Sequence, residues 1–312
     1  MPQETMNTLH PTFSTAAKNA AAASIQELRD VPYSSALIGW SSGAPRPRTL
    51  TMNVYVPPAS PEGAKRPALV MAFGGAFHRG CKEDDSFEAE GRNTAVAEYC
   101  RRFAERGFVT ASIDYRLVTE DPDPGTTPVI GHPENIPTSR VSYVRELLGL
   151  PPATPQMLGA GIEAASDDMA SAIAFIHRMS DTWHIDRHRV VAGGFSAGAR
   201  TALNAAFGEK APVAAVISLS GYIDIHDLNR HAPTGAQAPA VLLINGSHDL
   251  DYIVHNTPAM VQSLQTLGIR HRHAVVNEAG HFYDRNARLT WQDGHEPCTV
   301  EQAIATFLKD VL

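Results

Sequence analysis

The chain has 312 residues, of which 43% are hydrophobic and 19% are charged, so it has ample apolar material for a sizeable core. This composition excludes a disordered chain and a coiled coil. Lysine and arginine number 26 against 33 acidic residues, and the resulting net charge of −7 argues against a nucleic-acid partner. No apolar run approaches the roughly 18 residues that span a membrane, so we expect no membrane partner either.

Three cysteines, Cys81, Cys100 and Cys298, are too few for a disulfide framework in a chain of this length. Their odd number leaves at least one free thiol, which fits a reducing compartment. Residues 1–30 show no basic segment followed by an apolar one, which is the pattern of a signal peptide. We therefore expect a cytoplasmic protein, and the sequence leaves open whether it forms a homo-oligomer.

We expect residues 1–48 to form an N-terminal arm, followed by one domain over residues 49–312. An alanine-rich stretch, residues 15–28, could form a helix, although its apolar face is narrow. No internal repeat is visible.

Short apolar runs from residue 49 onward predict the strands. The first, residues 50–56, alternates apolar and polar side chains, which is typical of a half-buried strand. The later runs are continuously apolar, as in strands buried on both faces. They cover residues 68–73, 108–113, 190–192, 213–219, 240–244 and 273–276. Because helical segments separate these runs, we expect an α/β fold with a mostly parallel sheet flanked by helices.

Two of the intervening helices are legible in the sequence. Apolar residues recur at spacings of three and four from Met169 to Trp183, after a capping sequence that begins at Ser166. Near the C-terminus, Thr299 opens a capping-box pattern ahead of an apolar stripe that ends at Val311.

Residues 118–161 interrupt the alternation of strands and helices. Eight of the chain's 22 prolines lie between Pro122 and Pro155, and proline removes backbone donors that helices and strands need. One short helix, residues 140–148, is expected within this insert. Long irregular segments in compact domains are usually functional, so we predict a lid over a binding pocket rather than a passive surface insertion. We also expect residues 222–239 to help roof the pocket.

A serine lies in the sequence Gly194-Phe195-Ser196-Ala197-Gly198, between a predicted strand and a predicted helix. A nucleophilic serine needs a tight strand-to-helix turn, and glycine on either side lets the two arms of the turn approach. The helix that follows places the backbone N–H of Ala197 and the helix dipole at a developing oxyanion. The G-x-S-x-G pattern in this context predicts that Ser196 is a catalytic nucleophile.

In these features the chain resembles the α/β-hydrolase superfamily, and within it the carboxylesterases related to the hormone-sensitive-lipase and feruloyl-esterase-like branches. The resemblance runs from about Thr49 to the C-terminus. It implies an α/β-hydrolase fold with a small lid insertion, and chemistry that needs neither a metal nor an organic cofactor.

The loop after the second predicted strand, residues 73–80, reads F-G-G-A-F-H-R-G and resembles the H-G-G-G-F-x-x-G of these esterases. Phe73 replaces the histidine, which removes a polar anchor from the loop, and Ala76 replaces the third glycine. The resemblance implies an oxyanion hole made by the backbone N–H groups of Gly75, Ala76 and Ala197.

The resemblance also places the catalytic histidine in the loop before the last helix, where the chain has His281. A base on a loop can move a proton while a partner orients it. His271 and His273 share one face of the preceding strand, as metal ligands would. No further ligand is suitably spaced, so we expect no metal site there.

Four further side chains near these motifs are weaker candidates for substrate contacts, because their neighbours belong to the predicted site. They are Phe77, His78, His132 and Phe195.

The segment Asn245–Asp251 follows the predicted strand 240–244 and resembles the H-G-x-x-D of the family, with asparagine in place of the histidine. That register identifies Asp249 as the acid and leaves Asp251 as its rival. Ser196, Asp249 and His281 then follow the chain order of α/β-hydrolases. The acid would hold the histidine tautomer and stabilise the imidazolium.

The triplet Asp114-Tyr115-Arg116 closes the predicted strand 108–113 and resembles the D-Y-R of the same esterases. We expect it to support the fold through an ion pair rather than to take part in the chemistry.

The leading hypothesis is a serine carboxylic-ester hydrolase that acts on a small-molecule ester through an acyl-enzyme. An amidase or formamidase would use the same residues on a different bond and stays the alternative. A non-catalytic binding protein of this fold would usually have lost one of the three residues. A dinucleotide-dependent oxidoreductase is disfavoured, because no G-x-G-x-x-G follows a predicted strand.

Overall fold

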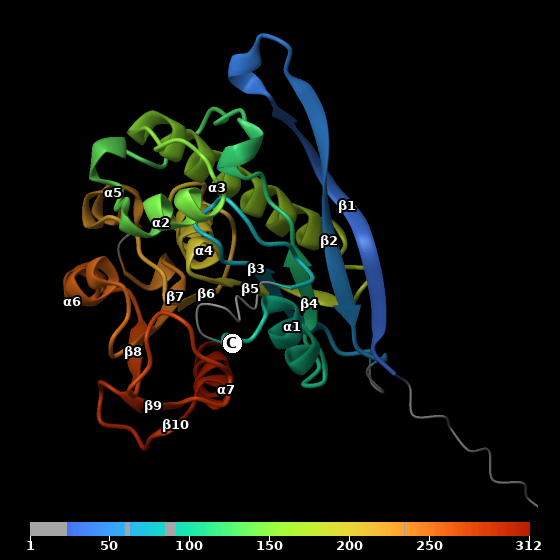
Figure 1. Ribbon diagram of the computed structural model, residues 1–312. Coiled ribbons are helices and arrows are strands. Elements are labelled where there is room, and N and C mark those ends of the chain that lie inside the picture. The colour runs from blue at the N-terminus through green and yellow to red at the C-terminus, as the bar shows by residue number, and fades with distance from the viewer. Residues whose placement is uncertain (1–23, 60–62, 85–91, 234) are drawn as a thin grey trace, which may run out of the picture.

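The computed structural model describes residues 24–59, 63–84, 92–233 and 235–312. In this part of the chain, ten strands form one sheet in the order β1-β2-β4-β3-β5-β6-β7-β8-β9-β10 (Figure 1). The strands are β1 (Gln26–Ile38), β2 (Arg46–Val56), β3 (Arg66–Ala72), β4 (Val109–Ile113), β5 (Ile185–Phe195), β6 (Ala215–Leu219), β7 (Ala240–Gly246), β8 (His271–Val276), β9 (Arg288–Trp291) and β10 (Cys298–Thr299). The six central strands from β4 to β8 pair in parallel, and both ends of the sheet are antiparallel. The predicted mostly parallel sheet is therefore confirmed.

Helices cover both faces of the sheet. They are α1 (Val96–Ala104), α2 (Ser139–Leu147), α3 (Pro155–Arg178), α4 (Ala197–Phe207), α5 (Ile225–His231), α6 (Asp251–Thr266) and α7 (Val300–Val311). α3 and α4 pack against each other on one face, while α1 and α7 lie on the other (Figure 1). Ion pairs connect α7 to α1: Glu301 of α7 lies 3.5 Å from Arg102 of α1 and 2.6 Å from Arg106, which follows α1. Among the described residues, no helix is apolar over a length sufficient to cross a bilayer.

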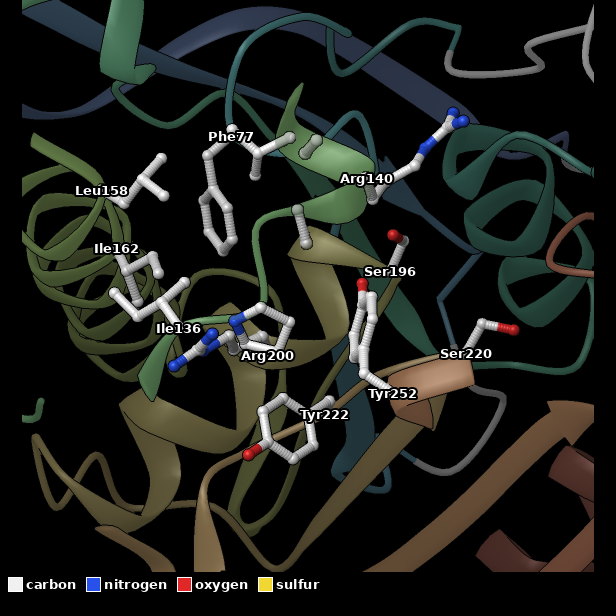
Figure 2. Close-up of a pocket in the computed structure, with 14 residues that line it drawn as sticks. Phe77, Ile136, Arg140, Leu158, Ile162, Ser196, Arg200, Ser220, Tyr222 and Tyr252 are labelled. Carbon is white, nitrogen blue, oxygen red and sulfur yellow. The ribbon is translucent and has the colours of Figure 1, made fainter. Parts of the chain in front are cut away.

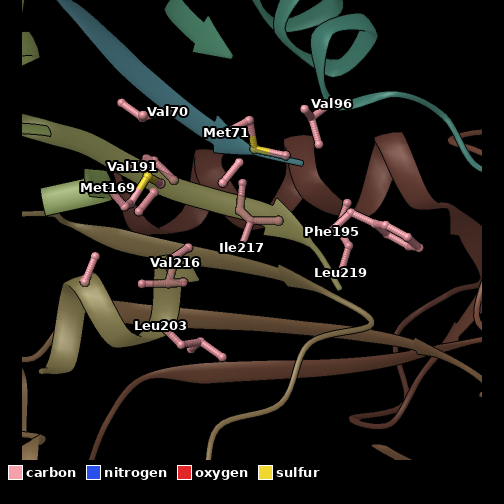
Figure 3. Packing of buried hydrophobic residues seen from close by; sticks show 14 of the residues in the cluster. Val70, Met71, Val96, Met169, Val191, Phe195, Leu203, Val216, Ile217 and Leu219 are labelled. Atoms are coloured by element: carbon pink, nitrogen blue, oxygen red, sulfur yellow. The ribbon is translucent and has the colours of Figure 1, made fainter. Parts of the chain in front are cut away.

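The central strands carry apolar side chains on both faces, as their sequences predicted. Met71 of β3, Val191 of β5 and Ile217 of β6 share one face of the sheet, and Leu203 of α4 belongs to the same continuous cluster of buried side chains (Figure 3). Gly193 lies among them, and a Cβ on it would be only 2.7 Å from the Met71 sulfur. Any larger residue at this position would therefore force the core apart.

The start of the chain differs from its prediction. Residues 26–38 form the edge strand β1, which pairs with β2, so the described part of the expected arm 1–48 belongs to the sheet. The helix expected over residues 15–28 is wrong for residues 26–28, and residues 15–23 lie outside the described residues. Two register shifts in β1 break its period-two alternation, which hid the strand in the sequence.

The helix expected from Ser166 begins eleven residues earlier, at Pro155. Thr154 caps it by accepting a 3.1 Å hydrogen bond from the Met157 N–H. Ser166 is buried inside the helix, where its hydroxyl donates to the Ile162 carbonyl at 2.7 Å. The capping box predicted at Thr299 is confirmed, as is the short helix of the insert, which is α2.

Candidate active site

Ser196 lies at the tip of the turn between β5 and α4 with a φ of 54°, a conformation that residues other than glycine rarely adopt. Its N–H donates to the Leu219 carbonyl at 2.8 Å, which ties the turn to the neighbouring strand. A Cβ on Gly194 would lie 2.4 Å from the carbonyl carbon of Gly198, and one on Gly198 would lie 2.0 Å from the Ala72 oxygen. The two glycines of the motif are therefore required by close backbone contact.

A chain of hydrogen bonds joins the three residues that the motifs singled out. His281 Nε2 is 2.8 Å from Ser196 Oγ, and His281 Nδ1 is 2.6 Å from Asp249 Oδ1. Ser196 follows β5, Asp249 follows β7 and His281 follows β8, so all three lie at the carboxyl ends of parallel strands. The rival Asp251 is the first residue of α6 and is exposed. The structure therefore brings Asp249, and not Asp251, to the histidine.

The Asp249 carboxylate is completely buried and is surrounded by donors. Its Oδ2 accepts from the Ser220 hydroxyl at 2.6 Å and from the Gly246 N–H at 3.1 Å, and its Oδ1 also accepts from the Leu250 N–H at 2.8 Å. These hydrogen bonds fix the position of the carboxylate, which can then orient the imidazole and stabilise its charge. Sequence analysis missed Ser220, whose only local signal is a polar residue directly after a buried strand.

The glycine-rich loop after β3 turns through three residues of positive φ, which are Gly75, Ala76 and Phe77. A Cβ on Gly75 would lie 2.0 Å from the Arg79 carbonyl oxygen, so only glycine fits there. Within the described part of the chain, the N–H groups of Gly75, Ala76 and Ala197 donate to no protein acceptor. Free backbone donors at such a turn can stabilise an anion that develops beside Ser196.

Comparison with known proteins shows which fold the chain has. A family model described as phospholipase/carboxylesterase matches residues 152–287. Among solved structures, the apo form of esterase 2 from Thermogutta terrifontis is 15% identical, with a TM-score of 0.53 over 93% of this chain and 92% of that chain. The chain has the α/β-hydrolase fold.

Two other structures of this Planctomycetes esterase are similar to the same extent. The native form is 15% identical with a TM-score of 0.52, and 84% of each chain is covered. The form phosphoramylated by tabun is 16% identical with a TM-score of 0.53, over 84% of this chain and 85% of that chain. No curated protein sequence matches the chain significantly.

The insert of this α/β-hydrolase fold lies against the pocket that contains Ser196 (Figure 2). The pocket has a cavity volume of about 40 Å³. Its lining comes from the glycine-rich loop, the insert, α3, α4 and the segments after β6 and β7: Ala76, Phe77, Ile136, Pro137, Arg140, Val141, Leu158, Ile162, Ser196, Ala197, Arg200, Ser220, Tyr222 and Tyr252. Phe77 and Tyr222 thus line the pocket, as the sequence predicted. Arg200 and Tyr252 also line it, although neither was predicted to contact the substrate.

Three of the weaker candidates are not among the described residues that line this pocket. His78 is buried beneath the loop, where its Nδ1 is 2.6 Å from the Ala76 oxygen and its Nε2 is 2.9 Å from Arg145 Nη1. Because Arg145 can only donate, Nδ1 carries the proton, and burial lowers the pKa of this neutral imidazole. Phe195 packs its ring against His281, with centroids 5.4 Å apart, and His132 is exposed. His78 thus supports the loop from behind.

The remaining polar motifs have structural partners. His273 Nε2 is 2.8 Å from the Asn245 side-chain oxygen, and no group of the described residues has the arrangement of a metal site. Arg116 Nη2 forms a buried ion pair with Asp168 at 2.8 Å and also donates to a backbone carbonyl of α3, while Nη1 donates to a backbone carbonyl of the insert. The ion pair expected of the D-Y-R triplet is therefore confirmed.

Proposed function

We propose that the protein is a serine carboxylic-ester hydrolase that acts through an acyl-enzyme. The observation that carries this proposal is the continuous chain of hydrogen bonds from Ser196 through His281 to Asp249, at 2.8 and 2.6 Å. It provides a nucleophile, a base within reach of its proton and a buried carboxylate that orients the base.

The reaction follows from these contacts. Ser196 Oγ attacks the ester carbonyl carbon while His281 Nε2 takes the hydroxyl proton, and the developing oxyanion accepts from the free N–H groups of the glycine-rich loop and Ala197. When the tetrahedral intermediate collapses, His281 returns the proton to the departing alcohol. Water, deprotonated by the same imidazole, then attacks the acyl-enzyme; as the bond to Ser196 breaks, His281 returns the proton to Ser196 Oγ and the acid is released. Asp249 orients the imidazole throughout and stabilises the imidazolium.

Two further observations support an esterase with a small acyl site. The matching family model describes phospholipases and carboxylesterases, and other structures of the similar Thermogutta esterase hold propionate or butyrate. The cavity of about 40 Å³ beside Ser196 suits a short acyl chain. Within the superfamily we assign the chain to the carboxylesterases whose loop and D-Y-R motifs it resembles, and we assign to residues 118–161 the role of a lid that limits substrate size.

The test is hydrolysis of a 4-nitrophenyl ester series of increasing acyl length beside a 4-nitroanilide, with mass spectrometry after treatment with an organophosphate. We expect the short esters to be cleaved fastest, with the organophosphate adduct on Ser196. Ser196→Ala should lose about 10⁴-fold or more in kcat, since removal of a triad member leaves only binding and the oxyanion hole. The exposed Ser247→Ala is the matched control. Faster cleavage of the anilide would identify an amidase, and an adduct on another serine would refute the mechanism.

A further inference from the structure

One buried cation in the pocket has no hydrogen-bond or ion-pair partner among the described residues. Arg200 lies one helical turn after Ser196 on α4, is only 7% exposed and lines the same pocket (Figure 2). Its Nε is buried without a hydrogen-bond acceptor, and among the described residues no carboxylate oxygen lies within 4 Å of the guanidinium. The guanidinium lies over the face of the Tyr222 ring, with Arg200 Cζ 5.6 Å from the ring centroid, in a cation–π contact.

The other buried arginines of the described residues show what such a group normally requires. Arg116 pairs with Asp168, Arg66 donates to two backbone carbonyls, and Arg145 donates to His78 and to a backbone carbonyl. A charge taken out of water is costly unless it is paired or fully hydrogen-bonded. Arg200 alone among these four leaves its side-chain donors unused.

Two acidic residues whose charges favour the Arg200 cation, Asp227 and Asp224, are engaged elsewhere. Asp224 caps α5 by accepting from the His226 N–H at 2.7 Å, and Asp227 accepts from the Gly131 N–H at 2.8 Å. Both lower the cost of burying the arginine from a distance. Neither forms an ion pair with it, so the guanidinium remains available to a ligand.

We propose that Arg200 binds a carboxylate of the substrate, so that the protein hydrolyses esters that carry a free carboxylate group, such as monoesters of short dicarboxylic acids. The guanidinium fork matches a carboxylate in two parallel hydrogen bonds. Ile136, Pro137 and Leu158 supply apolar walls to the same pocket, which strengthen such a pair by excluding water. One helical turn, about 5.4 Å along the α4 axis, separates Arg200 from the nucleophile, so one small ester can contact both residues. This inference rests on the proposed esterase function.

The experiment compares each anionic ester with its neutral partner. Monomethyl glutarate and dimethyl glutarate place the carboxylate on the acyl side, and 4-acetoxybenzoate and its methyl ester place it on the alcohol side. We expect the wild-type protein to prefer the anionic member of at least one pair. Arg200→Met should lower kcat/KM for that member by about 10- to 100-fold, mainly through KM, which is the range of charge-assisted hydrogen bonds. The neutral partner should change by less than about threefold, since only uniform binding to the carboxylate is lost.

Three controls separate this inference from its alternatives. Arg178→Met removes an exposed arginine outside the pocket and should leave the preference intact. Arg200→Lys keeps the charge without the fork and should keep part of the preference, which gives a second variant if the methionine variant does not fold. A melting temperature of Arg200→Met at or above that of the wild type is expected, because an unpaired buried charge is removed.

The outcomes are distinguishable. Hydrolysis of the neutral esters with no preference for either anionic ester would overturn the role of Arg200 while leaving the esterase function in place. An equal loss on anionic and neutral esters in Arg200→Met would mean that Arg200 is a structural residue. Failure to hydrolyse any ester of the two pairs or of the nitrophenyl series would overturn the esterase function itself.

Discussion

Tyr115 donates a 2.8 Å hydrogen bond from its phenol to the carbonyl oxygen of Phe73, and the two rings stack with centroids 4.3 Å apart. Phe73 stands at the start of the glycine-rich loop, where the esterases that the sequence resembles have a histidine. The contact fastens this loop to the segment that follows β4. Tyr115 therefore provides an anchor for the loop in place of the missing imidazole.

Tyr115→Phe keeps the stacked ring and removes only the hydrogen bond. We expect kcat to fall by roughly 5-fold with little change in KM, because the loop N–H groups act mainly on the transition state and one hydrogen bond is worth about 1 kcal/mol. Tyr33→Phe is the matched control, since Tyr33 is buried and donates to the backbone oxygen of Asp114 at 2.5 Å. Both variants should melt at lower temperature, and an equal kcat in the two would contradict the anchoring role.

The acid is tested by a pair of isosteric changes. Asp249→Asn should leave the fold intact and lower kcat by about 10⁴-fold, because an amide beside Nδ1 favours the wrong histidine tautomer. Asp251→Asn, at an exposed position two residues away, should retain nearly full activity. Steady-state kinetics and circular dichroism of the two proteins decide the matter, and the reverse order of losses would exclude Asp249.

The lid is tested at Val141, which is buried on α2 and lines the pocket. Val141→Ala should enlarge the acyl site and move the preferred 4-nitrophenyl ester to a longer chain, at a stability cost of about 1–3 kcal/mol. Leu147→Ala, on the same helix but 53% exposed, should leave the acyl-length profile unchanged. A fixed profile in Val141→Ala together with lower stability would identify the insert as a structural brace.

We expect Glu163 to make the stability of the protein vary with pH. This residue of α3 binds the insert through hydrogen bonds. Its carboxylate accepts from the N–H groups of Val129 at 2.8 Å and Ile130 at 2.7 Å, and burial raises its pKa from 4.5 to about 7. The folded state therefore binds more protons than the unfolded state between these values, so stability falls as the pH rises from about 4.5 through 7.

Glu163→Gln should flatten this part of the stability curve, as measured by thermal unfolding at a series of pH values. Glu209, whose pKa burial also raises to about 7, leaves a residual slope in the variant. Exposed Glu146→Gln is the control and should follow the wild-type curve. An unchanged slope in Glu163→Gln would show that other groups govern the transition.

The three residues of the hydrogen-bonded chain were predictable because each lies in a short motif directly after a predicted strand. Ser196, Asp249 and His281 meet only because parallel strands end at one edge of the sheet, which the strand pattern already implied. Ser220 and Arg200 were not predictable in the same way. Their roles depend on contacts with segments far along the chain, and neither lies in a motif that signals such a contact.

Local backbone geometry explains the other differences. His78 follows three residues of positive φ, a turn that the sequence does not reveal and that places the ring behind the loop rather than in the pocket. The helix α3 began earlier than expected because alanine and glycine between Leu158 and Ala165 give no clear apolar stripe. The apolar centres of β3 and β5 were predicted, since burial on both faces leaves little ambiguity, but β5 runs from Ile185 to Phe195, well beyond the predicted residues 190–192.

The irregular backbone of the edge strand β1 affects whether two molecules of this protein can pair edge to edge through their sheets. Its shifts in register, Pro32 within the strand and the positive φ of Asp30 make the backbone of this edge strand irregular. An irregular edge strand is a poor template for the regular backbone hydrogen bonds that would add a strand from another molecule. At the opposite margin, β10 is only two residues long. Both margins of this ten-stranded sheet thus resist open-ended strand addition, which favours a protein that stays dispersed at high concentration.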